Sequence, residues 1–66
     1  MHMKIKEVNF SYVDRSFPIG TYLGYCNELE VKNDNYDDIV DALQRTYPDY
    51  DDVKLMSFRK SYERKK

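Results

Sequence analysis

The side chains best suited to covalent or metal chemistry are scarce in this chain. Among its 66 residues there is one cysteine, Cys26, and one histidine, His2. A catalytic nucleophile needs a base within hydrogen-bond distance, and a structural zinc ion needs about four ligands. The only histidine that could assist Cys26 is His2, which lies in a Met-His-Met start typical of a cloning vector. We therefore expect a protein that is not an enzyme, with no catalytic residue, no metal site and no cofactor.

Carboxylates are concentrated in the middle of the chain. Residues 34–52 contain seven Asp against a single base, Arg45, which gives this segment a charge of −6. Their spacing lacks the alternating ligands, central Gly and terminal Glu of a calcium-binding loop. An acidic surface can instead accelerate encounter with a basic protein surface, although Asp also simply keeps small proteins soluble. The predicted protein-binding residues are these acidic residues and two tyrosines: Asp37, Asp38, Asp41, Asp49, Tyr50, Asp51, Asp52 and Tyr22.

The end of the chain has the opposite charge. Residues 53–66 contain six Lys or Arg against Glu63, which gives +5. Basic side chains interleaved with aromatic ones suit phosphate contact and base stacking, whereas the net charge of −1 is unlike that of most nucleic-acid-binding domains. The alternative function is thus a nucleic-acid-binding accessory protein that uses Arg59, Lys60, Tyr62 and Arg64. A simpler interpretation is an edge strand that its Lys and Arg protect from aggregation.

Tyrosine is over-represented, with seven residues and no tryptophan. Tyr36 and Tyr47 are expected to cap the core between helix and sheet, whereas Tyr22, Tyr50 and Tyr62 are harder to bury. Because exposed tyrosine is enriched where proteins recognise each other, this composition favours protein binding.

The length of the chain limits its architecture to a single domain over residues 1–66. We expect residues 1–3 to be a vector remnant or flexible, and residues 63–66 to form a flexible basic tail. No apolar run is long enough to cross a membrane. A lone thiol is typical of a reducing compartment, so we expect a cytoplasmic protein.

Alternating apolar residues predict strands over residues 4–13 and 21–32. The first has an apolar face of Val8, Phe10 and Tyr12, and the opposite parity of Ile5 predicts a bulge near Lys6-Glu7. The second has an apolar face of Leu23, Tyr25, Leu29 and Val31, and Gly24 marks a bulge or a close backbone approach. Residues 14–20, which include Pro18 and Gly20, predict the hairpin turn between them.

A helix is predicted between Asp34, the best candidate for its N-cap, and Thr46-Tyr47, where Pro48 ends it. Its apolar stripe consists of Tyr36, Ile39, Val40, Leu43 and Tyr47. Asp41 and Arg45 are spaced to pair across one turn.

An acidic loop over residues 49–52 and a third strand over residues 53–62 follow the helix, with a bulge near Leu55-Met56. The order β-β-α-β predicts an α+β fold. A right-handed crossover places the third strand beside the first, which gives an antiparallel sheet of order 2-1-3. One helix then covers one face of the sheet, and the other face stays open.

This layout, with an acidic helix after Asn33-Asp34 and a strand with a basic end, resembles that of small phage-encoded inhibitors of host machinery. One such group inhibits bacterial RNA polymerase. The resemblance covers the order of elements and no specific motif, so it implies no functional residue. The leading hypothesis is a phage or bacterial inhibitor or adaptor that binds a larger protein. A homodimer through strand edges or open sheet faces is a further hypothesis.

Overall fold

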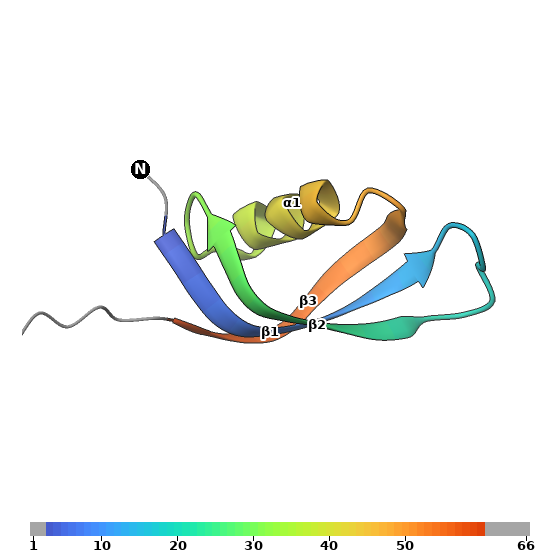
Figure 1. Ribbon diagram of the computed structural model, residues 1–66, viewed down its shortest axis with the longest axis horizontal. Coiled ribbons are helices and arrows are strands. Elements are labelled where there is room, and N and C mark those ends of the chain that lie inside the picture. The colour runs from blue at the N-terminus through green and yellow to red at the C-terminus, as the bar shows by residue number, and fades with distance from the viewer. Residues whose placement is uncertain (1–2, 61–66) are drawn as a thin grey trace, which may run out of the picture.

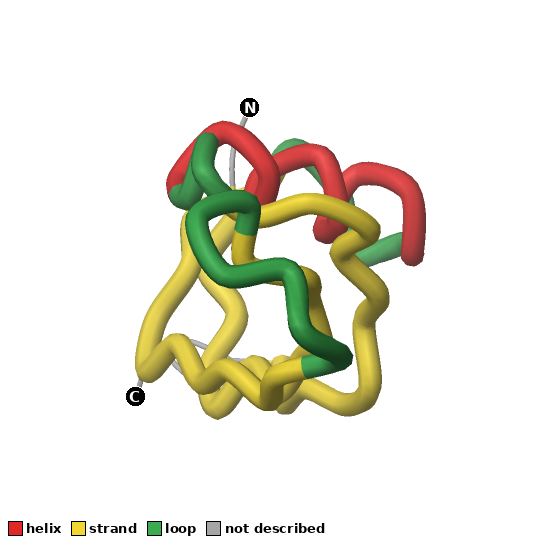
Figure 2. Tube along the Cα trace, turned by 90° about the vertical axis from the view of Figure 1, so that its right-hand side faces the viewer, coloured by secondary structure: helices red, strands yellow, loops and turns green. Residues whose placement is uncertain are grey.

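The computed structural model describes residues 3–60, which form β1 (Met3–Asp14), β2 (Tyr22–Val31), α1 (Tyr36–Thr46) and β3 (Tyr50–Lys60). The strand order is β2-β1-β3 with antiparallel pairing throughout. The sheet is strongly twisted and curls beneath α1, which lies across one face (Figures 1 and 2). This arrangement confirms the predicted α+β fold, its strand order and its single covering helix.

The described chain begins in a strand. Met3 is the first residue of β1 and pairs with Val31. Residues 1–2 and the predicted basic tail at residues 63–66 lie outside the described part of the chain.

The predicted bulge in β1 is present at Glu7. Between the pairs Lys6↔Arg59 and Asn9↔Ser57, β1 advances by three residues while β3 advances by two. Glu7 has a φ of 51°, a left-handed conformation that is unfavourable for a residue with a Cβ atom. This local change of direction allows Ile5 and Val8, three residues apart, both to point into the core.

The prediction for the apolar face of β2 was half wrong. Leu29 and Val31 are buried as expected, but Leu23 and Tyr25 are 74% and 56% exposed. The side-chain parity of β2 changes between Cys26, which packs against the core, and buried Leu29. This change lies opposite Glu7. In both strands, therefore, the residues that point toward the helix change parity at the same level of the sheet.

The prediction for Gly24 was half right: its pairing with β1 is regular, without a bulge, and the group that lies close to its backbone is the ring of Phe10. Gly24 is paired with Phe10 of β1, and a Cβ atom at this glycine would lie 2.4 Å from the Phe10 Cζ atom. Because the Phe10 ring is buried, it has little room to move. The missing side chain of Gly24 therefore provides the space that the ring occupies.

The third strand begins earlier than predicted. Tyr50 and the two residues after it belong to β3, so only Asp49 of the predicted acidic loop lies outside regular structure. The predicted bulge near Leu55-Met56 is confirmed. Asn9 pairs with Ser57 and Phe10 with Leu55, so β3 advances by two residues while β1 advances by one. A second irregularity occurs near Asp52, which has a φ of 50°. The end of the predicted strand, including Tyr62, lies outside the described residues.

Helix α1 has the predicted stripe except at Tyr36, and the predicted end, but a different N-cap. The Asn35 side chain accepts a hydrogen bond from the Asp38 backbone N–H at 2.8 Å, so Asn35 is the cap. The expected cap, Asp34, instead forms an ion pair with Lys60 of β3 at 2.8 Å. Asp34 therefore links the start of the helix to the last described residue of β3.

The core lies between α1 and the covered face of the sheet. Ile39 and Leu43 of the helix are fully buried, whereas Tyr36, which was expected to cap the core, is 50% exposed. The buried apolar side chains of the described residues are Ile5, Val8, Phe10, Leu29, Val31, Ile39, Leu43 and Val53. No buried side-chain polar atom within residues 3–60 lacks a hydrogen-bond partner.

Candidate functional site

The acidic residues of α1 have different surroundings. Asp37 is exposed in the first turn, whereas the Asp38 carboxylate accepts hydrogen bonds at 3.0 Å from the side-chain amides of Asn33 and Asn35. Asp41 forms the predicted ion pair with Arg45. Asp38 thus holds the start of the helix in place, and the charge of Asp41 is partly offset by its neighbour.

The remaining predicted acidic residues lie at the other end of the helix. Asp37 and Thr46 are separated by about 14 Å of helix axis at 1.5 Å per residue, and Asp49 follows beyond that end. Asp51 forms an ion pair with Arg15 at 2.8 Å, and Asp52 lies 3.8 Å from the Lys54 ammonium. The structure therefore divides the predicted acidic surface into two groups: Asp37, Asp38 and Asp41 on the first half of α1, and Asp49, Asp51 and Asp52 beyond its C-terminal end.

Most tyrosines form a stack of rings between the helix end and the hairpin. The Tyr12 and Tyr50 ring centroids are 3.7 Å apart with planes at 9°, and Tyr47 stacks on the other side of Tyr50 at 4.9 Å. Tyr22 extends the stack beyond Tyr12 at 5.6 Å. The Tyr50 hydroxyl raises the pKa of Tyr12 above its ordinary value. Tyr22 and Tyr50, both predicted to bind a partner, thus pack against other rings of the domain.

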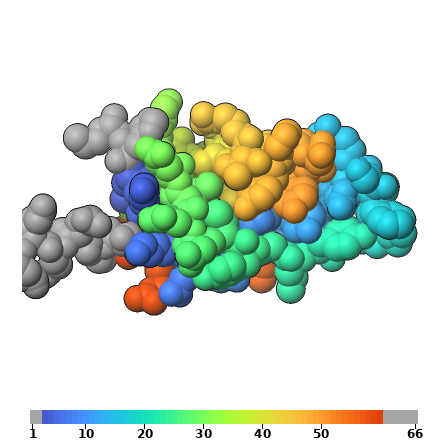
Figure 3. All heavy atoms as spheres, viewed as in Figure 1, coloured from blue at the N-terminus to red at the C-terminus, as the bar shows by residue number. Residues whose placement is uncertain are grey.

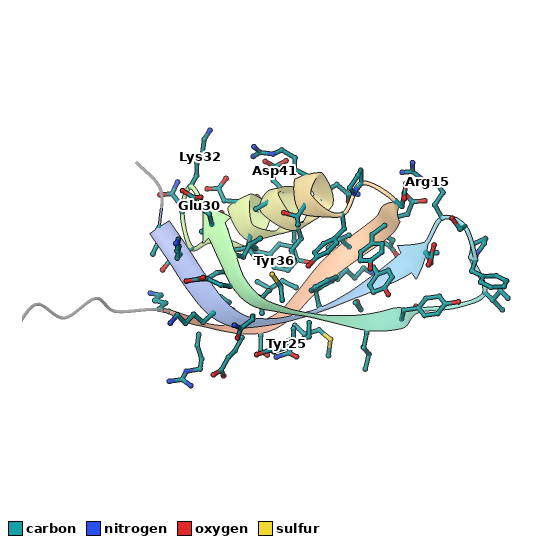
Figure 4. The ribbon with its side chains drawn as sticks, in the orientation of Figure 1. Arg15, Tyr25, Glu30, Lys32, Tyr36 and Asp41 are labelled. Carbon is teal, nitrogen blue, oxygen red and sulfur yellow. The ribbon has the colours of Figure 1, made fainter. Side chains whose placement is uncertain are left out.

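The sequence interpretation missed the largest exposed apolar side chains. Three lie on the face of the sheet that α1 leaves open: Leu23, Tyr25 and Met56. Leu23 and Tyr25 lie opposite Ser11 and Asn9 of β1. Tyr25 points away from the helix side (Figure 4). The change of face in β2 explains why regular alternation assigned Leu23 and Tyr25 to the core.

Two further exposed apolar residues occur at the turn between β1 and β2. Phe17 is 62% exposed and Ile19 is 75% exposed, and they flank Pro18. The hairpin projects beyond the helix and the start of β3 (Figure 3). Two large apolar residues within a turn of polar neighbours are a signal that the sequence contains, although the turn formers around them predict only a connection.

The two described residues of the predicted nucleic-acid site, Arg59 and Lys60, do not share one surface. Arg59 forms an ion pair with Glu7 at 2.9 Å, and Lys60 with Asp34 on the helix side. Because successive strand residues point to opposite faces, these two cations are separated by the sheet. Tyr62 and Arg64 lie outside the described residues.

A shallow polar hollow of about 190 Å³ lies between α1 and the end of β2. Its lining includes Glu30, Lys32 and Asp41, which gather at the upper edge of Figure 4. It contains both signs of charge and more polar than apolar surface. No group of three or more His, Cys, Asp or Glu side chains suited to a metal ion occurs within residues 3–60.

Comparisons with known proteins give no relative. A scan against protein-family models found no match, and neither the curated sequences nor the solved structures gave a significant match. Within the described part of the chain, α1 is too short and too polar to cross a membrane. The geometry of residues 3–60 therefore provides the basis for a functional proposal.

Proposed function

We propose that this protein is a non-enzymatic protein-binding module that acts as an inhibitor or adaptor on a larger partner, in a reducing compartment such as the cytoplasm. One observation supports this proposal. The core is already buried, and yet six large apolar side chains remain at least half exposed. These side chains are Phe17, Ile19, Leu23, Tyr25, Tyr36 and Met56. Exposed apolar patches mark interaction sites, and aromatic residues and Met are enriched at the centres of protein interfaces.

The acidic residues have a secondary role in this proposal. Exposed carboxylates contribute more to the rate of encounter than to the strength of a complex. Asp37 is the helix carboxylate best placed for this role, because Asp38 and Asp41 already interact with neighbouring side chains.

Affinity capture with the tagged protein from a bacterial lysate, followed by mass spectrometry, would identify the partner. Binding of the purified partner is then measured with the wild-type chain and with Asp37→Asn, using Glu28→Gln as a control with the same loss of charge elsewhere. We expect Asp37→Asn to lower the association rate at low salt, and less so at high salt, while the thermal melt is unchanged. Asp38 is avoided because its loss would weaken the helix cap.

The nucleic-acid alternative predicts a different result. Binding of short single- and double-stranded oligonucleotides would weaken steeply as salt increases, because phosphate contacts release counterions. A steep salt dependence with oligonucleotides, together with the absence of any protein partner, would contradict the proposed function.

A further inference from the structure

The turn between β1 and β2 extends beyond the rest of the sheet. The last pair between β1 and β3 is Asp14↔Tyr50, and the last pair between β1 and β2 is Tyr12↔Tyr22. Residues 15–21 therefore have no third strand beside them. Figure 1 shows this turn at the end of the molecule farthest from both termini of the described chain, away from α1.

Hydrogen bonds within the turn fix its shape although it projects into solvent. The Ser16 backbone N–H donates to the Asp14 carboxylate at 2.9 Å, and the Phe17 N–H donates to the Asp14 carbonyl at 3.0 Å. The Phe17 carbonyl accepts from the Ile19 N–H at 2.7 Å and from the Tyr22 hydroxyl at 3.1 Å. The conformation that presents the apolar residues is thus formed before any partner binds.

The base of the turn is also anchored to the start of β3, which lies beside the end of β1. The Arg15 backbone N–H donates to the Asp49 carbonyl at 3.0 Å, and its guanidinium forms the ion pair with Asp51. Pro18 fixes its own φ, and Gly20 takes a φ of 114° that few other residues adopt. Ordering of a flexible loop reduces affinity, so a turn that is already rigid loses less conformational entropy on binding.

The surroundings of the turn carry excess negative charge. Asp14, Asp49, Asp51 and Asp52 lie at its base, against Arg15 and Lys54, so four carboxylates face two cations. Arg15 is the only base in residues 14–22 and is already paired with Asp51. These carboxylates at the base of the turn would repel an anionic lipid surface or a phosphate backbone. A basic surface would be attracted to them.

We propose that the hairpin tip, formed by Phe17, Pro18 and Ile19, is the anchor of partner binding and inserts into an apolar cleft of a protein whose rim is basic. This inference rests on the proposed protein-binding function and specifies its surface and partner. Large apolar side chains that fill a pocket contribute most of the affinity of an interface, and the contacts around them exclude water.

The test compares two double variants with a purified partner identified by affinity capture. One variant carries Phe17→Ser and Ile19→Ser. The control carries Leu23→Thr and Tyr25→Thr on the open face, the competing apolar surface of similar exposure, to which this inference assigns no anchoring role. Circular dichroism melts establish that both variants fold, as expected for exposed positions. We expect the tip variant to lose more than about tenfold in affinity and the control to lose less than about threefold.

A third variant tests the basic rim. Asp49→Asn with Asp52→Asn should slow association several-fold at low salt, and high salt should remove the difference. If this variant and the wild type associate at equal rates at low salt, the inference that the partner's cleft has a basic rim is wrong. Loss of affinity in the open-face control, with the tip variant unaffected, would overturn the inference but leave the protein-binding function intact.

Two other results would overturn both proposals. The first is the absence of a captured protein that binds the chain in purified form. The second is binding of the tip to vesicles of phosphatidylcholine and phosphatidylglycerol without a protein partner. If the wild type binds these vesicles and the tip variant does not, the target of the tip is a lipid surface.

Discussion

The two halves of the covered sheet face are protected from water in different ways. Beneath α1, aliphatic side chains such as Ile5, Ile39 and Leu43 are completely buried. Toward the hairpin, beyond the end of the helix, the stacked rings of Tyr12 and Tyr50 cover the sheet and remain partly exposed. Phe10 lies between the two halves, because it is buried in the core and its ring contacts three tyrosines.

This difference explains how an eleven-residue helix can cover a longer sheet. A second helix would need many more residues, whereas tyrosine rings bury large areas and leave their hydroxyl groups in water. The rings also support the hairpin, since Tyr22 stacks on Tyr12 and donates to the Phe17 carbonyl. The excess of tyrosine is thus explained in large part by the architecture, and the hairpin tip is the exposed end of this aromatic half.

The largest loss of stability is expected in the aliphatic half. Leu43→Ala removes a completely buried side chain and should lower the free energy of unfolding by about 2–5 kcal/mol. In a domain this small, that loss leaves much of the chain unfolded at 25 °C. Urea unfolding followed by circular dichroism measures the change. Thr46→Ala, an exposed position on the same helix, is the control and should change stability by less than about 1 kcal/mol.

The boundary between the halves can be tested at Gly24. Gly24→Ala places a methyl group against the Phe10 ring and should destabilise the protein by about 1–3 kcal/mol, because the buried ring must shift. Combination with Phe10→Leu should recover part of the loss, so the two changes together should be less harmful than their sum. Strict additivity in urea unfolding would show that the contact with Phe10 is not the cause.

A smaller effect is expected in the aromatic half. Tyr50→Leu keeps an apolar side chain but removes the stacking with Tyr12 and Tyr47, which should lower stability by about 1–2 kcal/mol. Tyr36→Leu, on the half-exposed start of the helix, is the matched control and should have little effect. If both variants unfold at the same urea concentration as the wild type, the stack is a consequence of the fold and does not stabilise it.

The smallest effect concerns the ion pair at the base of the hairpin. The Arg15 guanidinium lowers the pKa of the Asp51 carboxyl below its ordinary value near 3.8. Because the folded-state pKa is the lower one, the pair stabilises the protein above about pH 4 and loses this contribution as the pH falls through the folded-state pKa. Both groups are exposed, so salt should screen the effect.

Arg15→Gln should raise the pKa of Asp51 toward its ordinary value, as measured by NMR titration of the carboxyl group. A pKa of Asp51 that does not change in this variant would mean that the pair is not formed in solution. The hairpin would then be anchored only through the Arg15 backbone N–H and Asp49.

The sequence alone determined the elements and their arrangement. Hydrophobic periodicity, Pro48 and the turn residues locate the strands and the helix, and the β-β-α-β order with a crossover over one sheet face favours the third strand beside the first. These features depend on residues close together in the chain, or on a rule that holds for almost all folds. The odd parity of Ile5 even predicted the bulge at Glu7, because an alternation that fails locally is itself a local signal.

Only the tertiary structure decided which side chains reach solvent. The change of face in β2 follows from the bulge in its neighbour, so Leu23 and Tyr25 are exposed despite regular alternation. Likewise, Asp34 pairs with Lys60 and leaves the helix cap to Asn35, a choice that depends on a strand that arrives later in the chain. Contacts between distant segments determine such outcomes, and a pattern confined to one segment contains no information about them.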